Sequence, residues 1–231
     1  NASFVSSRED QSWERLPETP CGSTAMITDS AFLSSQDLIV AVQGCGFFSI
    51  SLSSRLEEFG WQEVWRVDAY AVKPIPDGLL LTSYTEGETR VLDNDFMLID
   101  DWQMPGAYRA TVSPQGVWLT TRSGNGLWHI GYEPKVFAVP DGIVQESDGA
   151  PYLNDACFHK GVLLISDRFG EQIISLQVRD GEPMWDSVEL KVGQMPTRWI
   201  CGLEMGPLVI VQGGASGSLY ALRHMRPGSN S

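Results

Sequence analysis

The chain has 231 residues and carries 29 acidic side chains against 16 Lys and Arg, so its formal net charge is −13. Its hydrophobic content of 42% is enough for a real core and excludes a disordered chain. The acidic excess argues against nucleic acid and against an anionic membrane surface as partners, because both require clustered Lys and Arg. No apolar run approaches the roughly 20 residues of a membrane-spanning helix.

Short strands dominate the predicted elements. After a first strand at Trp13–Pro17, five β-branched or aromatic-rich apolar runs begin at residues 38, 79, 117, 162 and 208. Polar residues and a glycine follow each run, and a second strand-like stretch comes next, which predicts five hairpins with strands at 47–50, 89–92, 127–130, 172–176 and 218–222. The only helical signal is a single turn at 53–59.

Each hairpin belongs to a longer repeat. A strand-like stretch precedes each hairpin, at 29–33, 70–73, 109–112, 155–158 and 199–203, and fourth strands are predicted at 61–67, 96–102, 135–139 and 187–192. Four strands in about 40–45 residues is the size of a propeller blade. The sequence therefore predicts an all-β protein, a β-propeller of five four-stranded blades, with six blades, a β-sandwich or a stacked meander as alternatives.

The chain ends complete this hypothesis. The fifth repeat lacks a fourth strand, so residues 1–18 are expected to close the ring, with Trp13–Pro17 paired to Ser218–Leu222. Residues 1–231 then form a single domain and a monomer, and 226–231 form a disordered tail. Cellular location stays open, since a secreted, a periplasmic and a cytoplasmic protein all fit.

The four cysteines are not spaced like a zinc site. Cys21 and Cys45 are both expected in loops on one face of the first blade, where a disulfide is feasible if their Cα atoms lie within about 7 Å. Cys157 and Cys201 occupy matching places on adjacent inner strands and are expected to be buried free thiols.

Candidate ligand-binding residues come from the loops that enter each innermost strand and from the hairpin loops, which share one face of a propeller. Acids, arginines and aromatic residues mix there, as a pocket for a small polar ligand requires. The residues that we select as ligand-binding are Tyr70, Arg109, Arg122, Asp167, Arg168 and Trp199. Hard oxygen ligands for calcium are offered by Asn154, Asp155, Asp29 and Asp68.

The fourth repeat, from Asn154-Asp155 to Asp167-Arg168-Phe169-Gly170, resembles a blade of the senescence-marker/gluconolactonase, NHL and lactonase-type propellers. That resemblance implies a divalent cation, usually calcium, near the axis, and an acid–base group that opens a lactone or ester; Asp155 is the catalytic candidate. Ala25–Asp29 stands where the first of these families has a Glu-Gly-Pro ligand motif.

Two functions follow from these residues. We favour a propeller that binds a small polar molecule or a protein partner at its funnel face, because the first-blade Glu is absent. The alternative is a metal-dependent lactone or ester hydrolase of the gluconolactonase type. The sequence leaves open whether the protein is an enzyme.

Overall fold

The computed structural model describes residues 18–34, 36–51, 60–122, 126–131, 133–143, 153–167, 173–179 and 182–186 in full, and the backbone alone of 4–6, 13–15, 172, 187–189, 197–202, 208–213 and 219–223. Every regular element in these ranges is a β-strand. Among them there is no helix long and apolar enough to cross a membrane. The chain divides into two compact units, residues 1–104 and 105–231.

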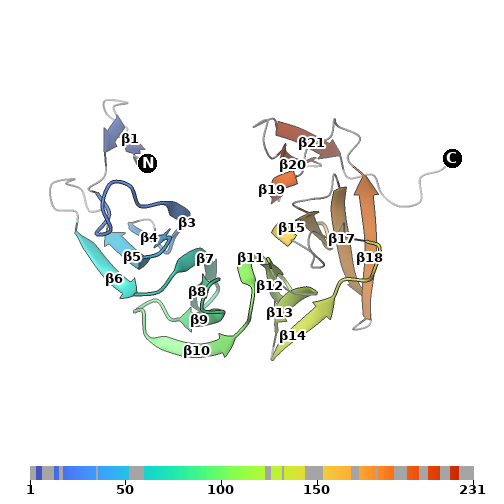
Figure 1. Cartoon of the computed structure of the whole chain (residues 1–231), viewed down its shortest axis with the longest axis horizontal. Coiled ribbons are helices and arrows are strands. Elements are labelled where there is room, and N and C mark those ends of the chain that lie inside the picture. The colour runs from blue at the N-terminus through green and yellow to red at the C-terminus, as the bar shows by residue number, and fades with distance from the viewer. Residues whose placement is uncertain are drawn as a thin grey trace. The chain divides into compact units, whose positions relative to one another are not determined.

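The first unit holds two four-stranded antiparallel sheets and a small two-stranded one (Figure 1). The first sheet contains β3 (Ile27–Phe32), β4 (Asp37–Val42), β5 (Gly46–Ser51) and β6 (Trp61–Trp65). The second contains β7 (Ala69–Ile75), β8 (Gly78–Ser83), β9 (Glu88–Leu92) and β10 (Leu98–Gln103). In both, strands that are consecutive in sequence are neighbours, as in a propeller blade.

The second unit repeats the pattern in two complete sheets and one of three strands. The complete sheets are β11 (Ala107–Ser113), β12 (Gly116–Thr121), β13 (Gly126–Ile130) and β14 (Pro134–Ala138), and β15 (Leu153–His159), β16 (Val162–Asp167), β17 (Gln172–Arg179) and β18 (Glu182–Glu189). The third has β19 (Thr197–Gly202), β20 (Leu208–Gly213) and β21 (Leu219–Arg223). All five predicted hairpins are therefore confirmed.

One strand prediction needs correction. The fourth strand of the fourth repeat is β18, which starts at Glu182 and not at Ser187, with Arg179 paired to Glu182. The sequence signal that we missed is Asp180-Gly181, a dipeptide typical of two-residue hairpins. The predicted N-terminal strand is present as β2 (Trp13–Arg15), which pairs with β1 (Phe4–Ser6). Ring closure through Ser218–Leu222 stays a prediction. The helical turn predicted at 53–59 and the tail at 226–231 lie outside the described residues.

The core lies between the sheets of each unit. In the first unit, Ile39 and Phe47 of the first sheet pack with Val72 and Leu79 of the second. In the second unit, Trp118 and Leu127 pack with Leu163 and Ile174 in the same way. The apolar runs of the second strands are buried on both faces because sheets flank them, which is why these runs read as continuous and not as alternating. A single domain over the whole chain stays a prediction.

Candidate functional site

A β-bulge recurs at the start of every innermost strand. The pairing register shifts between Ile27 and Asp29, Ala69 and Ala71, Ala107 and Ala110, Leu153 and Asp155, and Thr197 and Trp199. A bulge leaves a residue outside the ladder and changes the direction of its side chain. Three predicted site residues, Tyr70, Arg109 and Asn154, lie inside these bulges, so the repeat gives them equivalent positions in their sheets.

Buried hydroxyl groups satisfy the backbone at two of the bulges. The Arg109 N–H donates to Oγ1 of Thr120 over 3.2 Å, and the Asp155 N–H donates to Oγ of Ser166 over 3.0 Å. Both hydroxyl residues are 0% exposed, where an unsatisfied N–H would cost about 1–3 kcal/mol. Sequence reasoning missed Thr120 and Ser166, although both lie at polar ends of their apolar runs, in Leu119-Thr120-Thr121 and Ile165-Ser166.

In the first unit, Asp29 fastens one sheet to the next. Its Oδ1 accepts a hydrogen bond from the Ser30 N–H at 3.0 Å, and its Oδ2 accepts one from the Val72 N–H at 3.1 Å. Val72 belongs to β7, the innermost strand of the neighbouring sheet. This carboxylate therefore satisfies backbone donors of two blades and serves the fold directly.

Asp68 has a similar role among the loops. Its Oδ1 accepts a hydrogen bond from the Gly44 N–H at 2.6 Å, and its Oδ2 accepts one from the Thr85 hydroxyl. The exposed Glu86 accepts from the Ser83 hydroxyl and, at 3.5 Å, from the Asp68 N–H. These acids hold the hairpin loops of the first and second sheets together.

The carboxylates of the predicted calcium set accept hydrogen bonds from the protein itself. Asp29 and Asp68 already use their oxygens for backbone amides and a hydroxyl. Within the described part of the chain, no group of three or more His, Cys, Asp or Glu could hold a metal ion. Asn154 and Asp155 lie in the second unit, and Oδ1 of Asp155 accepts a hydrogen bond from the Ala156 N–H at 3.0 Å. Calcium binding stays a prediction for titration to test.

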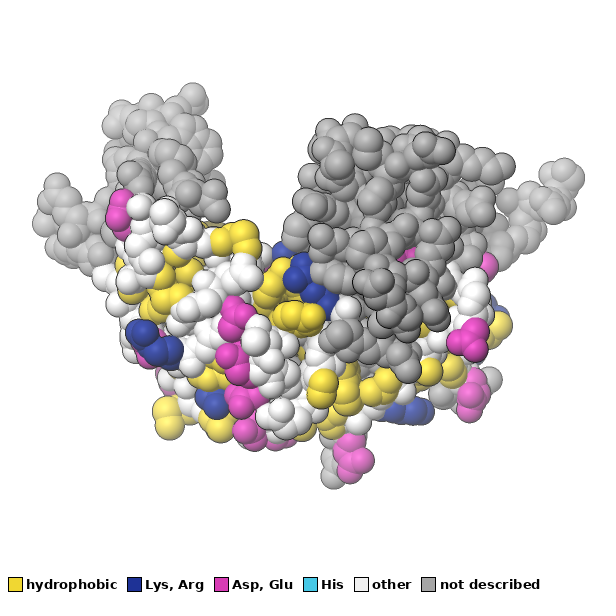
Figure 2. Space-filling view, in the orientation of Figure 1, with side chains coloured by type: hydrophobic (Ala, Val, Ile, Leu, Met, Phe, Trp, Pro, Cys, Tyr) yellow, Lys and Arg dark blue, Asp and Glu magenta, His cyan; other side chains and the backbone are white. Residues whose placement is uncertain are grey.

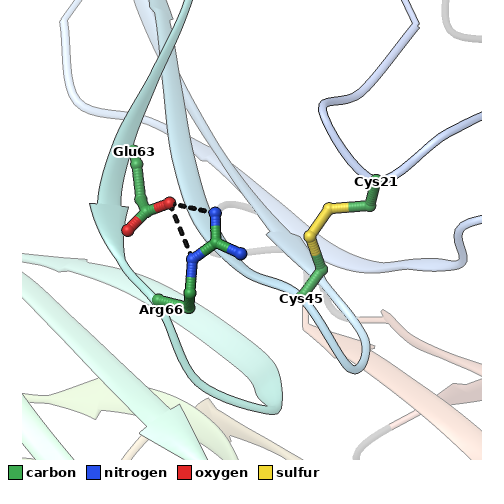
Figure 3. A network of polar contacts seen from close by, with 4 residues as sticks. All are labelled: Cys21, Cys45, Glu63 and Arg66. Carbon is green, nitrogen blue, oxygen red and sulfur yellow. Dashed lines mark hydrogen bonds and ion pairs between the residues drawn. A yellow bond between two sulfur atoms is a disulfide. The ribbon is translucent and has the colours of Figure 1, made fainter.

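The structure agrees with the cysteine predictions that fall on described residues. Cys21 and Cys45 form a disulfide, with Cα atoms 6.2 Å apart (Figure 3). Cys157 is buried, as expected. The side chain of Cys201 lies outside the described residues. Figure 3 also shows Arg66, which donates two hydrogen bonds to Glu63 and thereby holds the pKa of that carboxyl below its ordinary value; both groups are exposed.

Arginine and tyrosine side chains gather at the bulge of β11. The guanidinium carbon of Arg122 lies 3.8 Å from the ring centroid of Tyr108, and that of Arg109 lies 5.9 Å from the same centroid. Tyr108 is 2% exposed, while both arginines are half-buried. The Arg122 N–H donates to the Gly106 carbonyl oxygen at 3.0 Å, which holds the start of the hairpin loop. A buried ring thus orients two guanidinium groups through cation–π contacts.

The adjoining sheet contributes acids and an amide at its equivalent end. Asp167 ends β16 opposite Leu153 and is 0% exposed, and Asn154 is 4% exposed. The Thr120 hydroxyl of β12 donates to the Asn154 carbonyl oxygen at 3.4 Å, so the two sheets meet at this end. The fold therefore brings Arg109 and Arg122 to the same end of neighbouring sheets as Asn154, Asp155 and Asp167.

Of the other predicted ligand-binding residues, one is buried in the core and two have side chains outside the described part of the chain. Tyr70 is 7% exposed and packs edge-on against Tyr84, with ring centroids 6.2 Å apart, so its ring is mostly part of the core of the first unit. Arg168 lies outside the described residues. The backbone of Trp199 follows the bulge of β19, but its side chain is outside the described part.

Comparison with solved structures shows β-propellers. The β-propeller domain of Swd1 from Myceliophteria thermophila matches with a TM-score of 0.71 at 10% identity, covering 96% of this chain and 77% of that chain. A Bacteroides uniformis protein assigned as a 6-phosphogluconolactonase matches with a TM-score of 0.63 at 13% identity, covering 95% and 76%. No family model and no curated protein matches the sequence. The chain has a β-propeller fold, whereas membership of the senescence-marker/gluconolactonase family in particular is not shown.

Proposed function

We propose that the second unit binds a small polar molecule that carries an anionic group, such as a phosphate or a carboxylate. The site is the bulge end of β11, β12, β15 and β16, and we call it the bulge-end cluster. Its members are Tyr108, Arg109, Arg122, Asn154, Asp155 and Asp167.

One observation carries the proposal: two guanidinium groups lie against one buried tyrosine ring in a chain whose net charge is −13. A guanidinium presents N–H donors in a planar fork that matches a carboxylate or phosphate. Contact with the Tyr108 ring restricts the planes of Arg109 and Arg122 before any ligand arrives, which lowers the entropy lost on binding. Asn154, Asp155 and Asp167 add the hydrogen-bonding groups that would select hydroxyls on the rest of the molecule.

The test uses thermal melts with inorganic phosphate and gluconate 6-phosphate at constant ionic strength. A ligand at 100 times its Kd stabilises the native state by about 2.7 kcal/mol, which corresponds to about 5–10 °C for a chain of this size. We expect a saturable rise that Arg122→Gln abolishes. Arg66→Gln is the matched control, because Arg66 is an exposed arginine in the first unit. A melting temperature that the ligands do not raise, or that they raise equally in both variants, would overturn the proposal.

A protein partner that presents a carboxylate or phosphate is a second occupant of the same cluster. The chemistry at Arg109 and Arg122 is the same in that case. Small anions alone would then raise the melting temperature only weakly. An acidic or phosphorylated peptide would raise it more, because the peptide makes additional contacts.

Lactone hydrolysis is the second candidate function, favoured by the structural likeness to the Bacteroides protein assigned as a 6-phosphogluconolactonase. Asp155 is half-buried in the cluster and could accept a proton from a water that attacks the lactone carbonyl. The ring C–O bond then breaks, and the proton passes to the departing ring oxygen. Arg109 and Arg122 would hold an anionic group of the substrate.

Acid release from gluconolactone, followed with a pH indicator, tests this candidate. Turnover above the spontaneous rate that Asp155→Ala removes would establish a hydrolase. A calcium titration of the melting temperature is run beside it, and a rise of several degrees that the same substitution abolishes would favour a metal-dependent enzyme. No turnover and no calcium shift would leave binding as the function of the cluster.

A further inference from the structure

Three adjacent apolar residues are exposed at the outer edge of the second sheet. Met97, Leu98 and Ile99 are 65%, 54% and 55% exposed, although most large hydrophobic side chains of the described residues are buried. Leu98 and Ile99 belong to β10, the last strand of its sheet, whose recorded partner is β9 on one side. A terminal strand presents backbone N–H and C=O groups that can pair with another extended chain.

The turn before β10 holds these residues out of the core. Oδ1 of Asp93 accepts hydrogen bonds from the N–H groups of Asp95 and Met97, both at 2.9 Å, and the Asp93 N–H donates to the Met97 carbonyl at 2.9 Å. Phe96 adopts a positive φ of 62°, rare for an aromatic residue, and packs against the core of the first unit. The displayed segment is thus held in place before any partner binds, which lowers the cost of association.

Acidic residues surround the apolar edge. Asp95, Asp100 and Asp101 are all exposed within four residues of Leu98. Figure 2 shows acidic side chains gathered in a band, with hydrophobic side chains beside it, in the region where Figure 1 draws β10. A second copy of this chain is a poor occupant, because antiparallel or parallel pairing of two such edges would bring like charges together. A strand with Lys or Arg between apolar residues complements both features.

We infer that residues 95–101, the β10 edge, dock an extended basic and apolar segment of a partner protein by adding it as a strand to the second sheet. Backbone hydrogen bonds along β10 would supply affinity, and alternate side chains of the partner would meet Leu98 and the surrounding carboxylates. The register shift between Leu98 and Asp100 sets Ile99 outside the β9 ladder, so the partner strand is expected to be short. The β10 edge belongs to the first unit and the bulge-end cluster to the second, and the inference does not depend on the function proposed for the cluster.

The test measures fluorescence polarisation of a labelled eight-residue peptide of alternating Lys and Val. We expect Leu98→Arg to weaken binding at least tenfold. Met184→Arg is the matched control, because Met184 is 51% exposed on β18 and gives the same change of charge; its Kd should stay within twofold of the parent. Leu98 is exposed, so the melting temperature should change little in either variant.

Two further peptides separate strand addition from attraction of charge alone. A Lys–Val peptide N-methylated at every backbone nitrogen cannot donate strand hydrogen bonds from either edge and should bind at least tenfold more weakly, and a Glu–Val peptide should not bind. Equal weakening by both protein variants, full binding of the N-methylated peptide, or no binding at millimolar peptide would overturn the inference. Sedimentation velocity decides the remaining case: a dimer that Leu98→Arg dissociates would make a second copy the occupant and refute a basic partner.

Discussion

The disulfide between Cys21 and Cys45 should contribute substantially to stability. It ties the segment before β3 to the hairpin loop between β4 and β5, and the two cysteines pack beside the buried Val40, Val42 and Phe48. The perturbation is the pair of substitutions Cys21→Ser and Cys45→Ser, compared with reduction of the unmodified protein.

The magnitude follows from the length of chain that the bridge closes. The two cysteines are 24 residues apart, and loop-closure entropy for a loop of that length is worth about 3.5 kcal/mol at 25 °C. For a chain of 231 residues this corresponds to about 7–14 °C in melting temperature. In the chain-entropy model the bridge acts by restricting the unfolded chain, so most of the difference should arise in the unfolded state.

The assay is urea unfolding followed by tryptophan fluorescence, with and without dithiothreitol. The unmodified protein should lose stability on reduction, while the Cys21→Ser/Cys45→Ser variant should resemble the reduced protein and ignore the reductant. Thiol titration in denaturant without reductant should find two free thiols, those of Cys157 and Cys201. Four free thiols, or a variant as sensitive to dithiothreitol as the parent, would refute the reasoning.

Burial lowers the pKa of His129 below its ordinary 6.5, so the fold favours the neutral ring; stability should fall as the pH drops below about 6.5, and His129→Gln should reduce that fall in urea melts from pH 7.5 to 5. An unchanged pH dependence would contradict this. Asp29→Ala should cost about 1–3 kcal/mol by leaving a buried N–H of β7 without its acceptor, while Asp29→Asn keeps an acceptor and should cost less; equal losses would argue against the hydrogen bond. Gly78→Ala should be severely destabilising, because φ is +151° and a Cβ would lie 1.9 Å from a backbone oxygen. Gly44→Ala is its control, with a φ of +69° and no atom within 4 Å of the added Cβ, and should cost only about 1–2 kcal/mol of backbone strain in thermal melts; similar melting temperatures for the two variants would show that the close approach is not real.

The repeat could be recognised in the sequence because every blade follows the same local rules of strand and turn formation. A buried second strand must be apolar on both faces, and a hairpin must turn within a few residues, so runs such as 79–83 and glycines such as Gly87 mark every blade. The start of β18 could have been predicted by the same turn rule, because Asp180-Gly181 is a dipeptide typical of two-residue hairpins. The disulfide was also anticipated, because blade topology placed Cys21 and Cys45 on one face.

The roles of the polar residues were much harder to predict. Asp29, Asp68 and Asp155 have the same carboxylate and similar loop positions, so composition alone makes all three candidate metal ligands. The structure separates them by their donors: Asp29 accepts from a neighbouring sheet, and Asp68 accepts from Gly44 and Thr85. Hydrogen-bond partners more than 20 residues away in sequence, such as Val72 for Asp29, leave no local pattern to read.

The sequence by itself determined the fold class and the five hairpins, because strand period, turn chemistry and repeat length are local properties of the chain, and it made a bridge between Cys21 and Cys45 feasible. Only the tertiary structure decided which polar side chains share a site. The contact of Arg109 and Arg122 with Tyr108, the hydroxyl supports at Thr120 and Ser166, and the exposed edge at Leu98 all depend on how the paired strands, with their bulges, pack in each blade. That packing is a property of the folded blades, in which burial and distance couple residues that the sequence keeps apart.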